Sequence, residues 1–209
     1  MDKIKLGPQH LLNPRPAILA GTCIGGKPNF ITVSWCGIAS ADPPAVSLAI
    51  RNKRYSLTGF KENETFSINI PSAGMFRETD YCGVVSGTGE DKAEKCGFRL
   101  FDGQLKNAPM IEQCPVNMQC EILDILPVGD HSLVLGRIVE SYISADCFTD
   151  GKPDIRKIDP LCFCAFTGNA MGYYTVGDFI AETFSAGGLS GKTSAAGCGG
   201  DRLPAERRG

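Results

Sequence analysis

Short stretches in which apolar and polar residues alternate, many of them rich in β-branched or aromatic side chains, recur along the chain. Such stretches are typical of β-strands that bury one face. They predict strands over residues 17–24, 29–35, 45–50, 64–70, 118–126, 133–144, 163–167 and 171–175. Turn residues at Gly25-Gly26-Lys27-Pro28 and at Pro127-Val128-Gly129-Asp130 predict two hairpins.

Short helices are expected between the strands, over residues 56–61, 72–81 and 91–96, with Ser56 as an N-cap. The doubled proline in Asp42-Pro43-Pro44 marks a break, because proline resists both helix and central strand. Helices and strands do not alternate regularly, which disfavours a doubly wound parallel sheet. The pattern therefore predicts a mainly β protein, a mostly antiparallel barrel with helical connections.

The composition changes from Ala186 onward, where Gly, Ala and Ser dominate and the last residues are basic. We therefore expect one domain over residues 1–185 and a flexible tail over residues 186–209 that adds little to the core. The tail contains Gly191-Lys192-Thr193, which resembles the end of a P-loop. Too few residues follow for the helix and parallel sheet that such a loop needs, so a nucleotide triphosphatase is disfavoured.

Charge and hydropathy exclude several classes of partner. The chain of 209 residues has a formal net charge of −2, so it lacks the basic field that holds a nucleic-acid backbone. No apolar run approaches the ~20 residues that cross a bilayer. The first residues have no apolar core or cleavage site of a signal peptide. We expect a soluble, cytoplasmic protein with no nucleic-acid or membrane partner.

Cysteine and histidine offer few catalytic arrangements. The ten cysteines contain no C-x-x-C pair, so most are expected to be reduced and buried. Cys162 and Cys164 lie on one face of a predicted strand, but a metal site usually needs four ligands, and we expect no metal. Of the two histidines, His10 is expected to be exposed and His131 to lie in a turn. Neither accompanies a nucleophile motif, so hydrolysis is disfavoured.

An enzyme without catalytic side chains often delegates its chemistry to an organic cofactor. Asn29, Thr32 and Ser34 place amide and hydroxyl groups beside Trp35 on one predicted strand. A second group follows an apolar strand and forms a plausible phosphate site, since it offers two guanidiniums and a hydroxyl at a helix start: Arg51, Arg54 and Ser56. The turn at Ser86 and the nearby Lys92 add a loop and a second cation. Each group also has a purely structural interpretation, as a turn, a packed strand or a solvated strand end.

At these residues the sequence resembles the flavin reductase-like, FMN-binding split-barrel family, and especially its flavoredoxin branch. The resemblance covers roughly residues 11–184 and depends on the order and spacing of several segments. They are Asn13-Pro14-Arg15-Pro16, residues 29–35 with Asp42-Pro43-Pro44, residues 54–71, Asp80-Tyr81-Cys82-Gly83 with Ser86-Gly87 and Asp91-Lys92, and Gly129-Asp130-His131 with residues 135–138.

The resemblance implies a six-stranded antiparallel Greek-key split barrel, usually a homodimer with FMN near the interface. It implies that the flavin ring lies along residues 29–35, which include Asn29, Ile31, Thr32, Ser34 and Trp35. It also implies that Arg54 and Ser56 hold the phosphate, with Arg51 and Lys92 nearby. Ser86, in the matched Ser86-Gly87 segment, is a further candidate cofactor-binding residue. His131 matches the family's Gly-Asp-His segment, and we expect it close to the flavin or a nicotinamide as a candidate catalytic residue.

The function expected from this resemblance is an FMN-binding oxidoreductase or electron carrier. Electrons would pass through flavin N5 from NAD(P)H or from a redox partner protein. One alternative is a flavin reductase that supplies reduced flavin to a partner monooxygenase, and another is a non-catalytic flavin-binding protein. A further alternative assigns redox chemistry to thiols, either Cys82 or the Cys162 and Cys164 pair.

Overall fold

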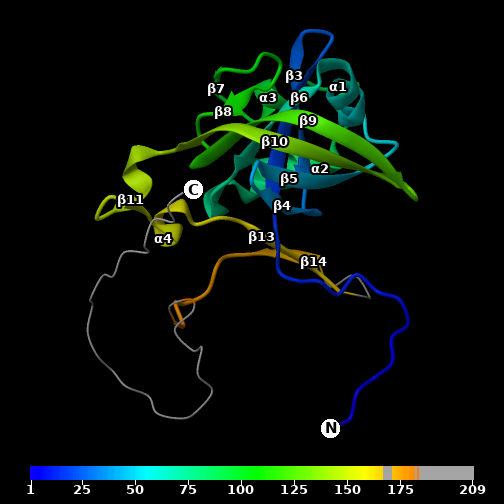
Figure 1. The fold of residues 1–209 in the computed structure, drawn as a ribbon, viewed down its shortest axis with the longest axis vertical. Coiled ribbons are helices and arrows are strands. Elements are labelled where there is room, and N and C mark those ends of the chain that lie inside the picture. Colours follow the sequence, from blue (N-terminus) through cyan, green and yellow to red (C-terminus); the bar gives the residue numbers. More distant parts are fainter. Residues whose placement is uncertain (167–170, 182, 184–209) are drawn as a thin grey trace, which may run out of the picture. The chain divides into compact units, whose positions relative to one another are not determined.

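The computed structural model of the protein describes residues 1–166, 171–181 and 183 (Figure 1). The chain divides into two units, Met1–Val176 and Gly177–Gly209, and every described helix and strand belongs to the first. The predicted tail over residues 186–209, including Gly191-Lys192-Thr193, lies outside the described residues, so its boundary stays a prediction. No described helix has both the length and the apolar character to span a membrane.

One antiparallel sheet of seven strands organises the first unit (Figure 1). Its order is β3 (Lys27–Val33), β2 (Ile18–Ile24), β6 (Thr65–Ile70), β9 (Val116–Val128), β10 (His131–Ile143), β5 (Pro44–Arg51) and β4 (Cys36–Ala41). The predicted mainly β, antiparallel split-barrel fold is therefore confirmed, with seven strands in the main sheet where six were expected. Within this sheet, the strand that the hydrophobic pattern did not predict is β4, because its sequence CGIASA consists mostly of small residues and does not alternate between apolar and polar positions.

The two ends of this sheet meet. β3 ends at Val33 and β4 begins at Cys36, although the two strands are the first and last of the sheet. Two linking residues span only a few ångströms, so the sheet must curl back on itself. The backbone N–H of Ala49 in β5 donates to the carbonyl of Trp35 in this link at 2.8 Å, which extends the pairing of β4 with β5, whereas β3 and β4 share no ladder. The barrel is thus split at the end of β3.

Smaller elements cover the sheet. The helices are α1 (Ser56–Asn63), α2 (Phe76–Val84), α3 (Lys92–Lys95) and α4 (Ile155–Ile158), with single 3-10 turns η1 (Ala73–Met75) and η2 (Ala145–Cys147). A second sheet joins β1 (Arg15–Pro16), β13 (Cys162–Ala165) and β14 (Met171–Tyr174). Two short hairpins complete the fold, β7 (Leu100–Phe101) with β8 (Met110–Ile111) and β11 (Phe148–Thr149) with β12 (Lys152–Pro153).

Strand β3 contributes to two hydrophobic cores. Ile31 and Val33 pack in the larger core, where Phe60 and Phe66 meet edge to face with ring centroids 5.4 Å apart. Phe30, on the opposite face of the strand, packs in a smaller core with residues of α2 and α3. Both faces of β3 are therefore buried over these residues, which holds the strand rigidly at the split of the barrel.

Both predicted hairpins form, but with tighter turns than expected. Gly25 and Gly26 make a two-residue turn with φ of 57° and 76°, so β3 begins at Lys27. Positive φ at both positions is the geometry that favours glycine in such turns. The second turn is Gly129-Asp130, and His131 is the first residue of β10, paired with Arg51 of β5. The expectation that His131 lies in the turn is therefore wrong by one residue.

Candidate functional site

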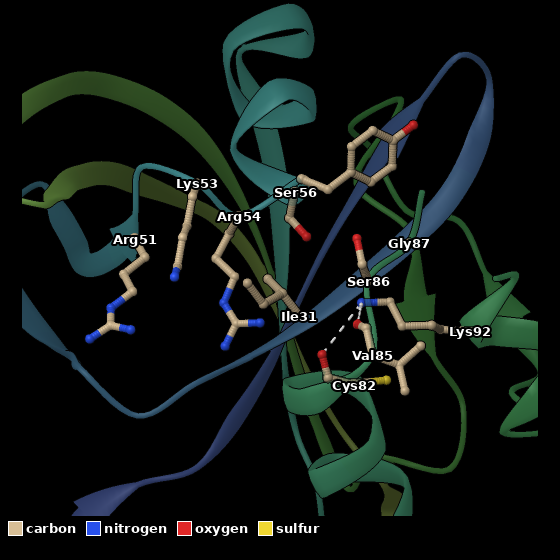
Figure 2. A pocket seen from close by; sticks show the side chains of 11 residues that line it. Ile31, Arg51, Lys53, Arg54, Ser56, Cys82, Val85, Ser86, Gly87 and Lys92 are labelled. Atoms are coloured by element: carbon tan, nitrogen blue, oxygen red, sulfur yellow. Dashed lines mark hydrogen bonds between the residues drawn. The ribbon is translucent and has the colours of Figure 1, made fainter. Parts of the chain in front are cut away.

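A cationic cavity of about 290 Å³ opens between the start of α1 and the segment that links α2 to α3 (Figure 2). Arg51, Lys53 and Arg54 approach it from the end of β5, and Lys92 and Ser86 approach it from the opposite side. Of the carboxylates that the structure describes, none lines it. A cavity with this charge and several donors is suited to a phosphate group.

Lys92 is the cation most strongly held in place. Its side chain is 3% exposed, and its Nζ donates to the carbonyl oxygens of Cys82 and Val85 at 3.4 and 3.3 Å (Figure 2). Burial lowers the pKa of Lys92, and the positive charge of Arg54 lowers it further. An anion in the cavity would offset both effects, because it favours the charged form of the lysine.

Arg51 is the cation with a partner of its own. Its Nε lies 3.5 Å from the Oδ2 atom of Asp130, in an exposed ion pair. Asp130 therefore compensates part of the charge of Arg51. Among the described residues, Lys53 and Arg54 make no salt bridge, so they leave more positive charge for a ligand.

Ser56 lines the same cavity, but it is not the N-cap of α1. The N-cap residue is Tyr55, which has helical backbone angles and makes no side-chain cap bond, and Ser56 is already in the helix. The Ser56 Oγ instead accepts a hydrogen bond from Asn29 Nδ2 at 2.7 Å. The predicted cap is therefore wrong, because the hydroxyl is used to tie α1 to β3.

A second cavity, of about 370 Å³, adjoins the first and shares Ile31, Arg51 and Arg54 with it. The chain from Ile31 to Trp35 forms one wall, and residues 49–51, His131, Phe163 and Met171 complete it. Strand β3 pairs only with β2, so its outer edge keeps unpaired backbone groups near this cavity. The two cavities together can accept an elongated molecule with an anionic end and a planar end.

Trp35 and His131 stack beside the second cavity, with ring centroids 4.8 Å apart and planes inclined by 15°. His131 Nδ1 lies 2.6 Å from Asp130 Oδ1. This hydrogen bond lowers the pKa of Asp130, and the electrostatic attraction of His131 and Arg51 lowers it further. The carboxylate thus fixes the orientation of the imidazole at the cavity wall. His10 is exposed as expected, but its ring also contacts Trp35 at a centroid distance of 4.9 Å.

The structure brings the predicted site residues to neighbouring cavities. Six line the cationic cavity: Ile31, Arg51, Arg54, Ser56, Ser86 and Lys92. Four others line the second cavity: Thr32, Ser34, Trp35 and His131. Asn29 is buried beneath Ser56 and lines a third cavity beside Tyr55 and Gly87. Asn29 therefore supports α1 through its hydrogen bond to Ser56, and it is not among the residues that line the second cavity.

Several lining residues were not predicted from the sequence. Lys53 belongs to the run Arg51-Asn52-Lys53-Arg54, so its charge could have signalled it. Phe163 comes from β13, which is distant in the sequence and carries no motif that points to the cavity. Gly87 belongs to the Ser86-Gly87 segment of the resemblance, but its steric role was not predicted: a Cβ there would overlap Asn29 Oδ1.

The described cysteines are free thiols. Cys82 lines the cationic cavity but is 1% exposed, and burial, followed by the proximity of Cys96, raises its pKa to about 12. Such a thiol is not a ready nucleophile. Within residues 1–166, 171–181 and 183, no three His, Cys, Asp or Glu side chains are grouped to hold a metal.

Comparison with known proteins identifies the family. Residues 11–164 match the model of the flavin reductase like domain. The flavoredoxin of Methanosarcina acetivorans is 35% identical with a TM-score of 0.83, covering 90% of this chain and 98% of that one. The flavoredoxin of Desulfovibrio vulgaris (Miyazaki F) is 32% identical with a TM-score of 0.82, covering 89% and 100%. An uncharacterized protein of Archaeoglobus fulgidus is 33% identical over 130 residues, 62% of this chain and 73% of that protein. The chain therefore belongs to the flavin reductase-like domain family.

Proposed function

We propose that the protein binds FMN and works as a flavin-dependent oxidoreductase or electron carrier. The observation that carries this proposal is the continuity of the two cavities through Ile31, Arg51 and Arg54. The cationic cavity has the charge for the phosphate of FMN, and the adjoining cavity has the planar and polar walls for its ring. The similarity to two flavoredoxins supports the same assignment.

The residues of the cationic cavity would hold the phosphate. Arg54 and Lys92 would provide charge-assisted hydrogen bonds, and the hydroxyls of Ser56 and Ser86 would add neutral ones. Ser56 Oγ accepts from Asn29, and its own O–H would donate to a phosphate oxygen. Lys53, at the same rim, would add a long-range attraction for the dianion.

The residues of the second cavity would orient and shield the ring. Trp35 and His131 provide a stacked aromatic wall, and the edge of β3 provides backbone donors and acceptors. Asp130 holds His131 in one orientation through Nδ1. Bound FMN would supply the redox chemistry, accepting and donating electrons at its ring. Phe163 and Met171 would exclude water from one side of it.

The donor of electrons is proposed to be NAD(P)H or a reduced partner protein. A nicotinamide would have to bind in the second cavity, since the described fold is antiparallel and offers no dinucleotide-binding domain. The test is a visible absorption spectrum of the purified protein, followed by anaerobic addition of NADH or NADPH. Bleaching of bound flavin by either nucleotide would support a reductase, and bleaching only by a reduced protein would support an electron carrier.

The same experiment can reject the proposal. A colourless protein that takes up no FMN on reconstitution would exclude it. Bound flavin that no donor reduces would leave a non-catalytic flavin-binding protein. The remaining alternative is a reductase that supplies free flavin to a partner. Gel filtration of the reduced, flavin-bound sample identifies it, because the flavin would then elute apart from the protein.

We also propose that the protein forms a homodimer. The second half of β9 exposes Leu123, Leu126 and Val128, whose side chains are 55%, 40% and 58% accessible. Val128 lies in a hollow beside Trp35 and His131, so a partner subunit covering it would reach the edge of the site. Analytical ultracentrifugation tests this proposal, and a monomer at micromolar concentration with full flavin binding would contradict it.

A further inference from the structure

Arg15 is a buried cation that has no counter-ion among the described residues. It is the first residue of β1 and lies opposite Phe163 in the sheet with β13. Arg15 is only 9% exposed, and its buried Nε donates to no described group. The guanidinium also makes no salt bridge within the described part of the chain. Buried charges in proteins are normally paired, because an unpaired one loses its hydration without compensation.

The contact that Arg15 does make leaves its charge uncompensated. The guanidinium Cζ lies 5.4 Å from the centre of the Phe163 ring. An aromatic face attracts a cation, but it provides no acceptor for the N–H groups. The guanidinium therefore keeps its capacity to bind an anion.

Arg15 lines a cavity of about 250 Å³ beside the proposed ring site. The other walls are mostly apolar or aromatic, among them Leu11, Trp35, Phe163 and Phe166, with Gln9 and His10 at one side, and none of the described carboxylates lines the cavity. Its volume equals about eight water molecules at ~30 Å³ each, which is enough for one six-membered ring with a small substituent. The cavity shares Trp35, Phe163 and Met171 with the proposed ring cavity, but Arg15 lines only this one of the two.

We propose that this cavity binds a small organic carboxylate with a planar apolar body. The carboxylate would pair with the Arg15 guanidinium, and the planar body would pack against Trp35 and Phe163. A carboxylate fits the fork of the guanidinium, and the apolar walls favour a hydrocarbon ring over a hydrated inorganic anion. This site is separate from the phosphate cavity, so the inference goes beyond the proposed function and does not require it.

The chain contains a built-in reporter for this site, because Trp35 is its single tryptophan and lines the cavity. Benzoate is the probe, and benzamide is its matched neutral control with nearly the same shape. Binding is measured by calorimetry and by Trp35 fluorescence on the full-length protein as purified, with its flavin content recorded from the visible spectrum. We expect benzoate to bind about tenfold more tightly than benzamide or better, as a charge-assisted pair would.

Variants connect this preference to Arg15. Arg15→Gln should abolish the preference for benzoate, whereas Arg15→Lys should retain part of it. Arg77→Gln is the control, since Arg77 also lies over an aromatic ring, Phe76, at 5.3 Å, but is exposed and lines none of these cavities. This control should behave as the unaltered protein. If Arg15→Gln does not fold, benzoate and benzamide are compared on the unaltered protein with excess FMN present, because a preference that persists in FMN and is reported by Trp35 lies outside the two cavities that hold Arg51 and Arg54.

Three results would overturn the inference: equal affinity for benzoate and benzamide, an unaltered preference in Arg15→Gln, or displacement of benzoate by FMN. The last would place benzoate in the ring cavity instead. A protein that prefers benzoate through Arg15 but binds no flavin would keep this inference while removing the proposed function. A protein that binds flavin without any benzoate preference would do the opposite.

Discussion

Asn29 Nδ2 donates a hydrogen bond of 2.7 Å to Ser56 Oγ, and this bond joins β3 to the first turn of α1. Both residues are buried, at 6% and 2% exposure. The loop at Gly87 packs against the same amide, so strand, helix and loop meet at Asn29. The position of the cationic cavity therefore depends on a neutral amide that carries no charge for the ligand.

Ser56→Ala should lower the free energy of unfolding by about 1–3 kcal/mol, because it leaves the buried Asn29 amide without an acceptor. Asn29→Ala should have a comparable effect, and the double variant should cost less than the sum, because either single change already breaks the bond. Urea denaturation measures all three. Thr58→Ala, an exposed change in the same helix, is the control. Strictly additive effects would show that the two side chains do not stabilise each other.

Gly87→Ala should weaken FMN binding at least about tenfold, whereas Gly89→Ala should not. A Cβ at residue 87 would overlap Asn29 Oδ1 and lie 3.2 Å from Tyr55 Cδ1, so the loop that carries Ser86 must move. A Cβ at Gly89 meets nothing within 4 Å. Each tenfold change corresponds to about 1.4 kcal/mol of binding free energy. Fluorescence titration with FMN compares the pair, and equal affinities would contradict the placement of the phosphate at this loop.

Arg54→Ala should weaken FMN binding by roughly 1.5–3 kcal/mol, the contribution expected of a charge-assisted hydrogen bond to phosphate. Riboflavin, which lacks the phosphate, should bind the variant and the unaltered protein equally well. Lys61→Ala removes an exposed cation from the far end of α1 and serves as the control. If the loss of affinity were as large for riboflavin as for FMN, Arg54 would be acting on the ring and not on the phosphate.

Local patterns in the sequence predicted the cationic cavity better than the remainder of the site. Arg51 and Arg54 follow one strand within a single turn, so their proximity needs no knowledge of the tertiary fold. Phe163 reaches the second cavity only because β13 pairs with β1, a contact between residues far apart in the sequence. A pattern of alternating residues contains no information on such a pairing.

The errors have the same physical origin. Ser56 has the residue type of an N-cap, but its hydroxyl oxygen accepts a hydrogen bond from the side-chain amide of Asn29, 27 positions earlier. Tertiary structure therefore overrides the local preference. β4 escapes the pattern because it is an edge strand of small and mostly exposed residues. The site could thus be outlined from the sequence, whereas its walls and its internal hydrogen bonds required the fold.

Lys92 should make FMN binding depend on pH. In the flavin-free protein, burial and then the charge of Arg54 lower the pKa of Lys92, whereas a bound phosphate dianion would raise it. Affinity for FMN should therefore be highest below the pKa of Lys92 in the free protein. It should fall as the pH rises from that value towards the higher value in the complex, because binding then requires uptake of a proton.

The stability of the flavin-free protein should change in the opposite direction. The pKa of Lys92 is lower in the folded state than in the unfolded chain, so between those two values the unfolded chain binds more protons. The contribution of this group to stability therefore rises with pH over that interval.

Titrations of FMN and riboflavin from neutral to alkaline pH, on the unaltered protein and on Lys92→Met, test the predicted pH dependence of FMN affinity. The decline should appear for FMN on the unaltered protein and should be absent for riboflavin and for the variant. An equal decline for both flavins would assign it to the flavin ring, and the proposed role of Lys92 at the phosphate would be wrong.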